Sequence, residues 1–272
     1  MDKKANILDA APSPIKVFIS STFVDLVEEF QYLHSSTFPQ LNEICQRYGT
    51  FFVPFDQRRT AVDYRSSSDF TLKHALDSIK ICYPYFMCII GRQYGEYSLP
   101  NPAFSEKHES EMNSNISRSF INRNLNYAIK HGYSELKQFS NTPISLLELE
   151  VQYASLMKTS IELKKCHCHF YVQDHLEIMK QKKDINNSQY PATDDPNFPT
   201  LFEAEDEFAL NRLIELKIEI TEKGLPVKFF ASKEELEEAI LKDWMEILFN
   251  AYQGIAMNSV YGKFVYLFIV ST

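Results

Sequence analysis

The sequence predicts an α/β protein built on one doubly wound, five-stranded parallel sheet with the flavodoxin-like strand order 2-1-3-4-5. Three observations lead to this prediction. Short apolar, β-branched runs alternate along the chain with longer segments of helical periodicity. The runs are apolar throughout, as expected of strands that are covered on both faces of a parallel sheet. Five such units follow one another, which is typical of a doubly wound fold.

The first two predicted strands lie close to the N-terminus. Residues 15–20 (IKVFIS) form the first apolar run, and residues 50–55 (TFFVPF) form the second. Between them, apolar residues recur with a helical period over residues 25–48. We expect a break in this helix at Pro39, because proline removes a helical hydrogen bond, and an end at Gly49.

The other elements continue the alternation. Further strands are predicted at residues 85–90, 166–172 and 225–230. Further helices are predicted at residues 68–81, 145–157, 203–222 and 233–249. Because each helix falls before or after a strand, the chain provides cover for both faces of the sheet.

The predicted domain is a single α/β unit over residues 15–250. Residues 1–14 are expected to be a flexible N-terminus, and the tail at residues 251–272 belongs to no strand–helix unit. Two long polar segments interrupt the pattern, at residues 97–142 and 180–199. We expect both to be mobile surface insertions, because long polar connections are rarely part of a core.

Charge and glycine usage exclude several classes of function. The chain of 272 residues carries 28 basic and 36 acidic residues, for a formal net charge of −8, and has no basic block. We therefore expect no binding to nucleic acid. The seven glycines fit neither the dinucleotide-binding motif nor the P-loop motif, so the common glycine-rich phosphate sites are absent.

The cysteines and the hydropathy indicate an intracellular protein. The five cysteines are irregularly spaced, and no signal peptide precedes them, so we expect free thiols in a reducing compartment. No apolar run reaches the roughly 18 to 20 residues that span a bilayer. The expected location is the cytoplasm, with no membrane span.

The motif at residues 166–169, Cys-His-Cys-His, contains residue types that bind metals. Strand alternation, however, places both thiols on one face and both imidazoles on the other. One metal ion would not easily reach all four, so no metal site is predicted. Redox or metal sensing through Cys166 and Cys168 remains a third functional option.

A ligand site is predicted where the carboxyl ends of the strands meet, because ligands of open α/β sheets bind at that edge. The polar and flexible residues at the ends of the first three strands are Ser20, Ser21, Thr22, Asp56, Arg58, Gly91, Tyr94 and Gly95. Each has a plain structural alternative: hydroxyls before a helix often cap it, and Asp56 and Arg58 can pair on the rim.

Two glutamates on the helix at residues 145–157 are candidate catalytic residues. With about 100° per residue, Glu150 falls about 40° from Leu146, inside the apolar face, whereas Glu148 falls about 200° away on the polar side. A carboxylate that faces a core must be paired or protonated. Arg58, Arg59 or a strand-end hydroxyl would be the partner of Glu150, in either a structural pair or a carboxyl group tuned for a ligand.

Seven segments carry a family resemblance: VFISSTFVDLVEE (17–29), FPQLNEIC (38–45), VPFDQR (53–58), IGRQYGE (90–96), SLLELEVQYA (145–154), KGLPVKFF (223–230) and KDW (242–244). In these segments the chain resembles the N-terminal TIR-like (Toll/interleukin-1-receptor-like) domain of the nephrocystin-3 and tetratricopeptide repeat protein 41 group. Similar domains occur in the telomerase-associated and NACHT/WD-repeat proteins. The resemblance implies a domain that heads a longer signalling-type chain with a NACHT-like ATPase and helical repeats, here without them. We therefore expect a truncated product or a stand-alone module.

The resemblance implies an interaction or regulatory module, in the cytoplasm or at a cilium, whose partner is another copy or a scaffold protein, with no cofactor required. The alternative is an enzyme that cleaves NAD as its substrate, in which Glu150 stabilises the developing positive charge and Ser20, Ser21 and Arg58 position the phosphates. The family pattern has an acidic pair at Glu148 and Glu150. The chain departs from the pattern at Phe30, where an arginine is usual, and at Arg59, where an aromatic residue is usual.

Overall fold

A computed structural model describes residues 13–22, 25–57, 69–98, 111–174 and 206–256. Its centre is a sheet of five parallel strands in the order β2-β1-β3-β4-β5. The strands are β1 (Ile15–Ser20), β2 (Phe52–Asp56), β3 (Tyr85–Ile90), β4 (His167–Gln173) and β5 (Val227–Phe230). The predicted fold class and strand order are confirmed.

The register places the carboxyl ends of β2, β1 and β3 beside one another. In β1, Ile19 lies beside Asp56 of β2, and Ser20 lies beside Cys88 of β3. The chain order reverses at β1, since β2 lies on one side of it and β3 to β5 lie on the other. This is the topological switch point, where a ligand site was predicted from the sequence.

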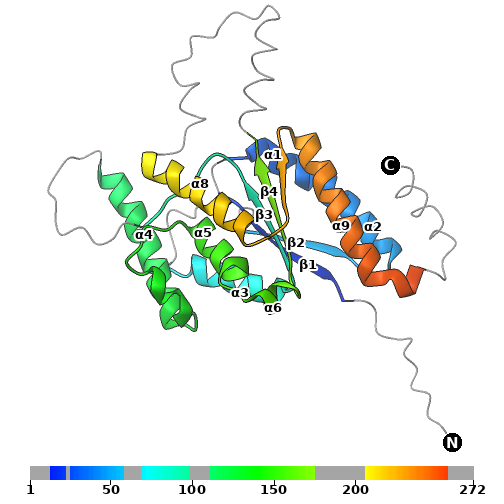
Figure 1. Ribbon diagram of the computed structural model, residues 1–272, viewed down its shortest axis with the longest axis horizontal. Helices are drawn as coiled ribbons and strands as arrows, with labels where there is room; N and C mark the ends of the chain where they lie inside the picture. The colour runs from blue at the N-terminus through cyan, green and yellow to red at the C-terminus, as the bar shows by residue number, and fades with distance from the viewer. Residues whose placement is uncertain (1–12, 23–24, 58–68, 99–110, 175–205, 257–272) are drawn as a thin grey trace, which may run out of the picture.

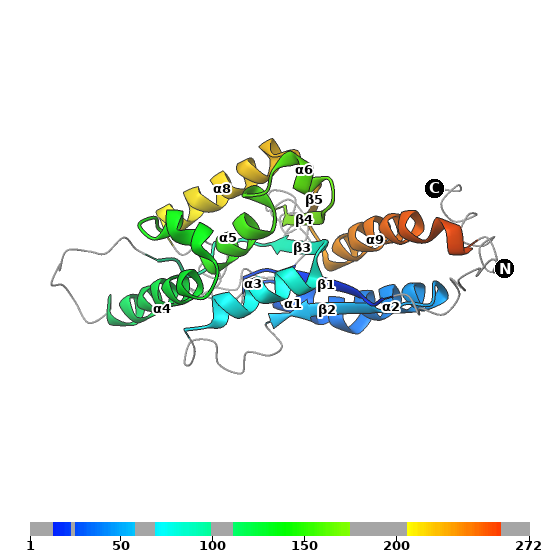
Figure 2. The same ribbon diagram turned by 90° about the horizontal axis from the view of Figure 1, so that it is seen from below.

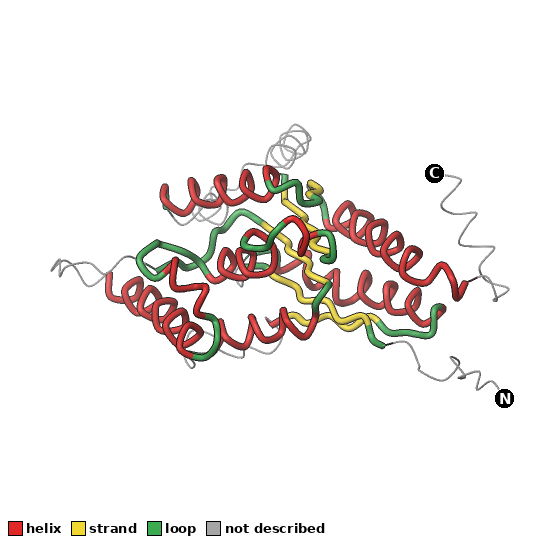
Figure 3. The backbone as a smooth tube through the Cα atoms, turned by 60° about the horizontal axis from the view of Figure 1, so that its bottom comes forward, coloured by secondary structure: helices red, strands yellow, loops and turns green. Residues whose placement is uncertain are grey.

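Helices cover both faces of the sheet (Figures 1 and 3). One face carries α1 (Val27–Tyr32), the π-helical turn η1 (Leu33–Thr37), α2 (Phe38–Arg47) and α9 (Lys233–Ala256). The other face carries α3 (Thr71–Cys82), α5 (Leu146–Val151), the π-helical turn η4 (Gln152–Leu156) and α8 (Glu207–Glu222). Alternate side chains of each strand enter the two cores: Phe18 and Cys88 face α5, whereas Val17 and Met87 face α9.

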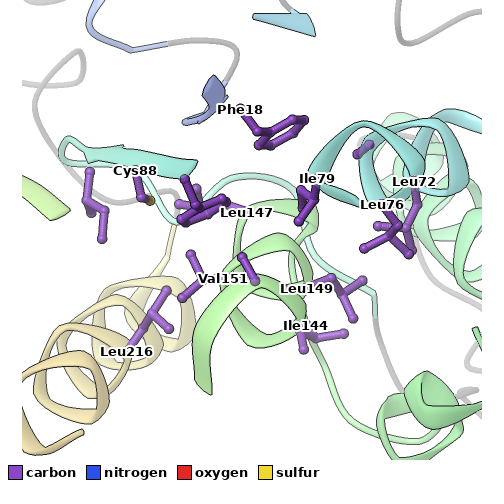
Figure 4. Packing of buried hydrophobic residues seen from close by; sticks show 14 of the residues in the cluster. Phe18, Leu72, Leu76, Ile79, Cys88, Ile144, Leu147, Leu149, Val151 and Leu216 are labelled. Atoms are coloured by element: carbon purple, nitrogen blue, oxygen red, sulfur yellow. The ribbon is translucent and has the colours of Figure 1, made fainter. Parts of the chain in front are cut away.

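The core on the α5 side fixes the position of that helix. Leu147 and Val151 of α5 lie between Phe18 of β1 and Leu216 of α8, and Leu149 points toward Ile144 (Figure 4). Leu147, Leu149 and Val151 are at most 4% exposed. Because apolar neighbours surround this short helix, any polar side chain that it carries is held in a fixed orientation.

Several element boundaries differ from the prediction. The irregularity expected at Pro39 lies just before it, in η1, and Pro39 occupies the first turn of α2, where its missing N–H costs nothing. Helix α9 continues to Ala256, so the first residues of the predicted tail are helical. The remainder of the tail, the insertion at residues 180–199 and most of the N-terminal segment lie outside the described residues.

The first predicted insertion, residues 97–142, contributes to the core rather than only to the surface. It contains α4 (Glu111–Lys130) and a 3-10 helix, η3 (Ser134–Phe139). Helix α4 packs beside α3 (Figure 2), and its Ile121, Leu125 and Ala128 are at most 1% exposed. The Asn124 side chain accepts a hydrogen bond of 3.0 Å from the backbone N–H of Leu72, at the start of α3. This helix was not predicted from the sequence, because the many Ser and Asn residues of the segment outnumber those of its apolar face.

The short helix α6 (Ser160–Leu163) precedes β4 and begins with a capping box formed by Thr159 and Glu162. In the described part of the chain, none of the helices has the length and apolar character needed to cross a membrane.

Candidate functional site

Glu150 lies at the switch point, as the helical wheel predicted. Its Oε2 accepts a hydrogen bond of 2.6 Å from the Ser20 hydroxyl at the end of β1. Glu150 is 7% exposed and Ser20 is 1% exposed. The strand-end hydroxyl is therefore the partner of Glu150, whereas Arg58 and Arg59, the other predicted partners, lie outside the described residues.

Burial controls the protonation of Glu150. Desolvation raises the pKa of its carboxyl group to about 8; the hydrogen bond from Ser20 acts in the opposite direction, and the negative charge of Asp56 adds a smaller increase. The protonated form therefore predominates at neutral pH. A neutral carboxyl group is suited to hydrogen bonding within a core, but it is poorly suited to stabilising a developing positive charge.

Asp56, at the end of β2, has a partner that the sequence did not predict. His34 of η1 lies with its Nε2 2.8 Å from Oδ2 of Asp56, and Asp56 is 9% exposed. His34 also packs edge-on against the ring of Phe38, which fixes its orientation. The π-helical turn thus brings an imidazole to the strand ends, and no motif in the sequence indicated this position.

Asp25 organises the loops after β1 and β3. Its Oδ2 accepts hydrogen bonds from the backbone N–H groups of Arg92 and Gln93, at 2.8 and 3.1 Å, and its Oδ1 accepts one from the Thr22 hydroxyl. A Cβ atom added to Gly91 would lie 2.1 Å from Oδ2 of Asp25. Glycine is therefore required at position 91 for the approach of a carboxylate rather than for a phosphate.

Ser21 lies with its hydroxyl at the same edge of the sheet. It is 9% exposed, and its Oγ has no hydrogen-bond partner among the described residues. On the other side of the loop after β3, the Lys217 Nζ donates a hydrogen bond of 3.4 Å to the carbonyl oxygen of Gly91. Burial lowers the pKa of Lys217, and the charge of Asp25 partly offsets this effect.

Glu148, which the helical wheel places on the polar side of the helix, is buried. It is 1% exposed, and its two oxygens accept hydrogen bonds from Nε and Nη2 of Arg212 on α8, the former at 3.1 Å. Arg212 also pairs with Glu215 and Glu219, at 2.8 and 3.1 Å. The polar side of α5 faces α8 instead of solvent, so Glu148 joins two helices.

Tyr94 belongs to the same polar network. It is fully buried; its hydroxyl donates to Oε2 of Glu148 and accepts a hydrogen bond of 3.2 Å from the backbone N–H of Ser145. Ser145 caps α5 by accepting a hydrogen bond from the backbone N–H of Glu148. Gly95 follows with a φ of +86°, a conformation that favours glycine. These contacts link the loop after β3 to the start of α5.

The strand that holds the cysteines alternates as predicted. Cys168 packs in the core on the α5 side, whereas His169 faces α9, with its Nδ1 3.3 Å from Oδ2 of Asp243. Among the residues that the structure describes, no three His, Cys, Asp or Glu side chains are grouped so that they would hold a metal ion.

Comparison with known proteins places the chain in a family. A family model described as "Domain of unknown function (DUF4062)" matches residues 16–245, which include β2 to β5 and all of β1 except its first residue. The chain belongs to the DUF4062 family. No solved structure matches it.

The relatives of this DUF4062 chain are longer proteins. It is 29% identical to the human "Putative tetratricopeptide repeat protein 41" over 94% of this chain and 19% of that protein. It is 28% identical to rat tetratricopeptide repeat protein 41 and 29% identical to the mouse protein, in each case over 88% of this chain and 18% of the relative. The DUF4062 chain thus spans about a fifth of the length of these relatives.

Proposed function

We propose that this domain is a protein-interaction module that associates with a second copy of itself through the outer face of α8. The observation that carries the proposal is an apolar stripe on that face. Leu210, Ile214 and Ile218 are 46%, 47% and 50% exposed. The opposite face of α8 is buried in the core through Ala209, Leu213, Leu216 and Ile220. A helix that is apolar on both sides favours a second contact.

The spacing of the stripe favours a two-fold contact between identical copies. Its residues are four apart, so Leu210, Ile214 and Ile218 lie above one another on one face. The stripe is symmetric about Ile214. If two copies of α8 packed antiparallel, Ile214 would meet Ile214, and Leu210 of each copy would meet Ile218 of the other, as a self-complementary interface requires.

The edge strand of the sheet carries a further exposed apolar side chain. Phe229 of β5 is 66% exposed, and it points to the same side of the sheet as Val227, which packs against the core beneath α5 and α8. Strand β5 pairs only with β4 among the described strands. An exposed aromatic residue on an edge strand that follows α8 directly adds apolar area for a partner.

The relatives support an interaction role in a larger assembly. Their names describe tetratricopeptide repeat proteins, and this chain matches about a fifth of each. Together with the resemblance to TIR-like domains, this supports a module that heads a longer signalling-type chain, with a NACHT-like ATPase and repeats after it, in the cytoplasm or at a cilium. In such a chain, pairing of the module through α8 would bring two copies of the following domains together.

Ile214→Glu tests the α8 contact. We expect the wild-type chain to dimerise with rising concentration in sedimentation velocity, and the variant to dimerise at least about 30-fold more weakly, because a central interface residue contributes about 2 kcal/mol or more. A two-fold interface also carries each substitution twice.

Ile161→Glu is the matched control. Ile161 is 72% exposed on α6 and is not part of the α8 stripe, so this variant should dimerise like the wild type. A wild-type chain that stays monomeric at all concentrations, or equal effects of both substitutions, would contradict the proposal.

The geometry at the strand ends does not favour the alternative, cleavage of NAD. Glu150 is closed off by Ser20, and its raised pKa keeps it largely neutral near pH 7. We expect no release of nicotinamide when the chain is incubated with NAD and the products are separated by chromatography. Turnover that disappears in Glu150→Ala would establish the enzyme instead.

A further inference from the structure

A pocket of about 200 Å³ lies at the end of the sheet opposite to Glu150. It opens beside the amino ends of β3 and β4, where the chain enters these strands at Pro84 and Cys166. Aromatic rings, including Tyr83 and Tyr153, form part of the wall. Two thiols, Cys166 and Cys168, complete it. None of the residues that line this pocket belongs to the candidate site at the carboxyl ends of the strands.

The two thiols line the same pocket but differ in access. Cys166 is partly exposed, whereas Cys168 is 4% exposed. Strand alternation points both side chains to the same face of the sheet, where both line the pocket and pack against the core on the α5 side. Cys166 is also within 3.2 Å of the carbonyl oxygen of Glu162. A partly exposed thiol with a buried thiol beside it is the arrangement of an attacking and a resolving cysteine.

The surroundings of Cys166 favour its thiolate. The hydrogen bond with Cys168 contributes most to lowering the pKa of Cys166 to about 7; burial opposes this change, and the charge of Lys158 and a hydrogen bond with Tyr83 lower it further. The charge of Glu162 has a small opposing effect. A lowered pKa increases the fraction of Cys166 that is present as the reactive thiolate near neutral pH.

A second lysine adds positive charge to the pocket. Lys80 lines it, with Nζ 4.0 Å from the centre of the Tyr133 ring. Lys158 stands between aromatic rings, 5.8 Å from that of Tyr153 and 6.0 Å from that of Tyr83. The charge of Lys158 stabilises negative charge on the Cys166 sulfur, and Lys80 adds positive charge to the wall of the same pocket.

The other cysteines lack these features. Burial raises the pKa of Cys45 and of Cys82 to about 12, and it also raises the pKa of Cys88. All three are at most 1% exposed. Reactivity should therefore be confined to the pocket.

We propose that Cys166 is an oxidation site for small hydroperoxides and that Cys168 resolves the oxidised product to a disulfide. In the first step the Cys166 thiolate attacks one oxygen of hydrogen peroxide, the O–O bond breaks, and hydroxide leaves and becomes water by protonation from solvent. The sulfur is oxidised to sulfenic acid and the peroxide is reduced. In the second step the Cys168 sulfur attacks the Cys166 sulfur, the S–O bond breaks, and the Cys168 proton leaves with hydroxide as water.

The test uses the whole chain, reduced and then treated with equimolar hydrogen peroxide. Trypsin releases both cysteines on one peptide, residues 166–180, so the disulfide appears in mass spectrometry as the loss of two hydrogen atoms from that peptide. We expect this loss before any change at the other three cysteines. In Cys168→Ala, Cys166 should stop at the sulfenic acid and be labelled by dimedone. In Cys166→Ser, the peptide should stay unmodified.

Lys158→Gln tests whether Cys166 reacts because its pKa is lowered or only because it is exposed. It should slow oxidation about 5-fold near pH 7 and move the midpoint of the pH–rate profile upward, because less thiolate is present. Lys165→Gln is the matched control: it lies next to Cys166 in the sequence but outside the pocket lining, and should change the rate little.

Two results would overturn the proposal. The first is oxidation at Cys45, Cys82 or Cys88 as fast as at Cys166; the second is a rate for Lys158→Gln equal to that of Lys165→Gln. Cys166→Ser and Lys158→Gln alter partly exposed side chains, so these comparisons remain decisive even if Cys168→Ala disturbs the core.

Discussion

Replacing Arg212 by methionine is expected to lower the free energy of unfolding by about 3 to 5 kcal/mol. The substitution keeps much of the side-chain volume but leaves Glu148, which is 1% exposed, without a cation. The Tyr94 hydroxyl and, at 3.5 Å, the Gln152 amide would still donate to Glu148, but neutral donors do not replace the two charged N–H groups of a guanidinium. An unpaired carboxylate in a core is among the most costly consequences of a single substitution.

Urea unfolding of Arg212→Met near pH 7 measures this effect. Arg123→Met is the control: Arg123 lies 2.8 Å from Asp69, but both side chains are about half exposed, so its loss should cost less than about 1 kcal/mol. The double variant Arg212→Met/Glu148→Gln should recover part of the loss, since it removes the stranded charge. Equal losses for Arg212→Met and Arg123→Met would show that the Glu148 pair is not the buried link between α5 and α8.

The sheet was predictable because its strands are local features of the sequence. The strands β1 and β3 are short runs buried on both sides, so every residue in a run such as 85–90 is apolar or aromatic. Helix α4 was not recognised, because the polar residues of 97–142 outnumber the few apolar ones that pack on α3. The composition of a segment describes all of its residues together, whereas a helix can pack on a core with apolar residues on one face alone.

The two glutamates of α5 show what a helical wheel resolves. The wheel placed Glu150 among the apolar residues, and the structure confirms this, because Glu150 is buried with Leu147, Leu149 and Val151 on α5. The wheel also placed Glu148 on the polar side, but that side is covered by Arg212 of α8. Periodicity identifies the faces of a helix; it does not identify what covers each face, because that depends on segments far away in the chain.

The same limit explains the remaining residues that were missed. His34 and Lys217 reach the strand ends from elements distant in sequence from the strands that they meet. The thiol pair of residues 166 and 168 was visible, but the lysine and the tyrosine that tune Cys166 come from other elements. A site formed by side chains from several distant elements can be recognised only when the three-dimensional structure is known.

Replacing Glu150 by glutamine is expected to stabilise the chain at neutral pH, the opposite of the effect of Arg212→Met. The pKa of Glu150 is raised from 4.5 in the unfolded chain to about 8 in the folded chain, because desolvation penalises the charged form. Folding therefore requires a proton that the unfolded chain has already released near pH 7. Glutamine is neutral at every pH, and its carbonyl oxygen still accepts the hydrogen bond from Ser20.

The raised pKa of Glu150 also predicts how the stability difference between Glu150→Gln and the wild type changes with pH. The favourable contribution of protonated Glu150 is complete below pH 4.5, and it is lost at about 1.4 kcal/mol per pH unit as the pH rises toward about 8. Chemical unfolding across this window should find Glu150→Gln equal to the wild type at the acidic end and about 3 kcal/mol more stable near pH 7. Glu148→Gln, two residues away, should instead lower stability near pH 7, because it breaks the pair with Arg212. A constant difference between Glu150→Gln and the wild type across the window would mean that Glu150 is not held neutral. It would then be a charged carboxylate at the switch point, and the NAD-cleaving alternative would regain its catalytic group.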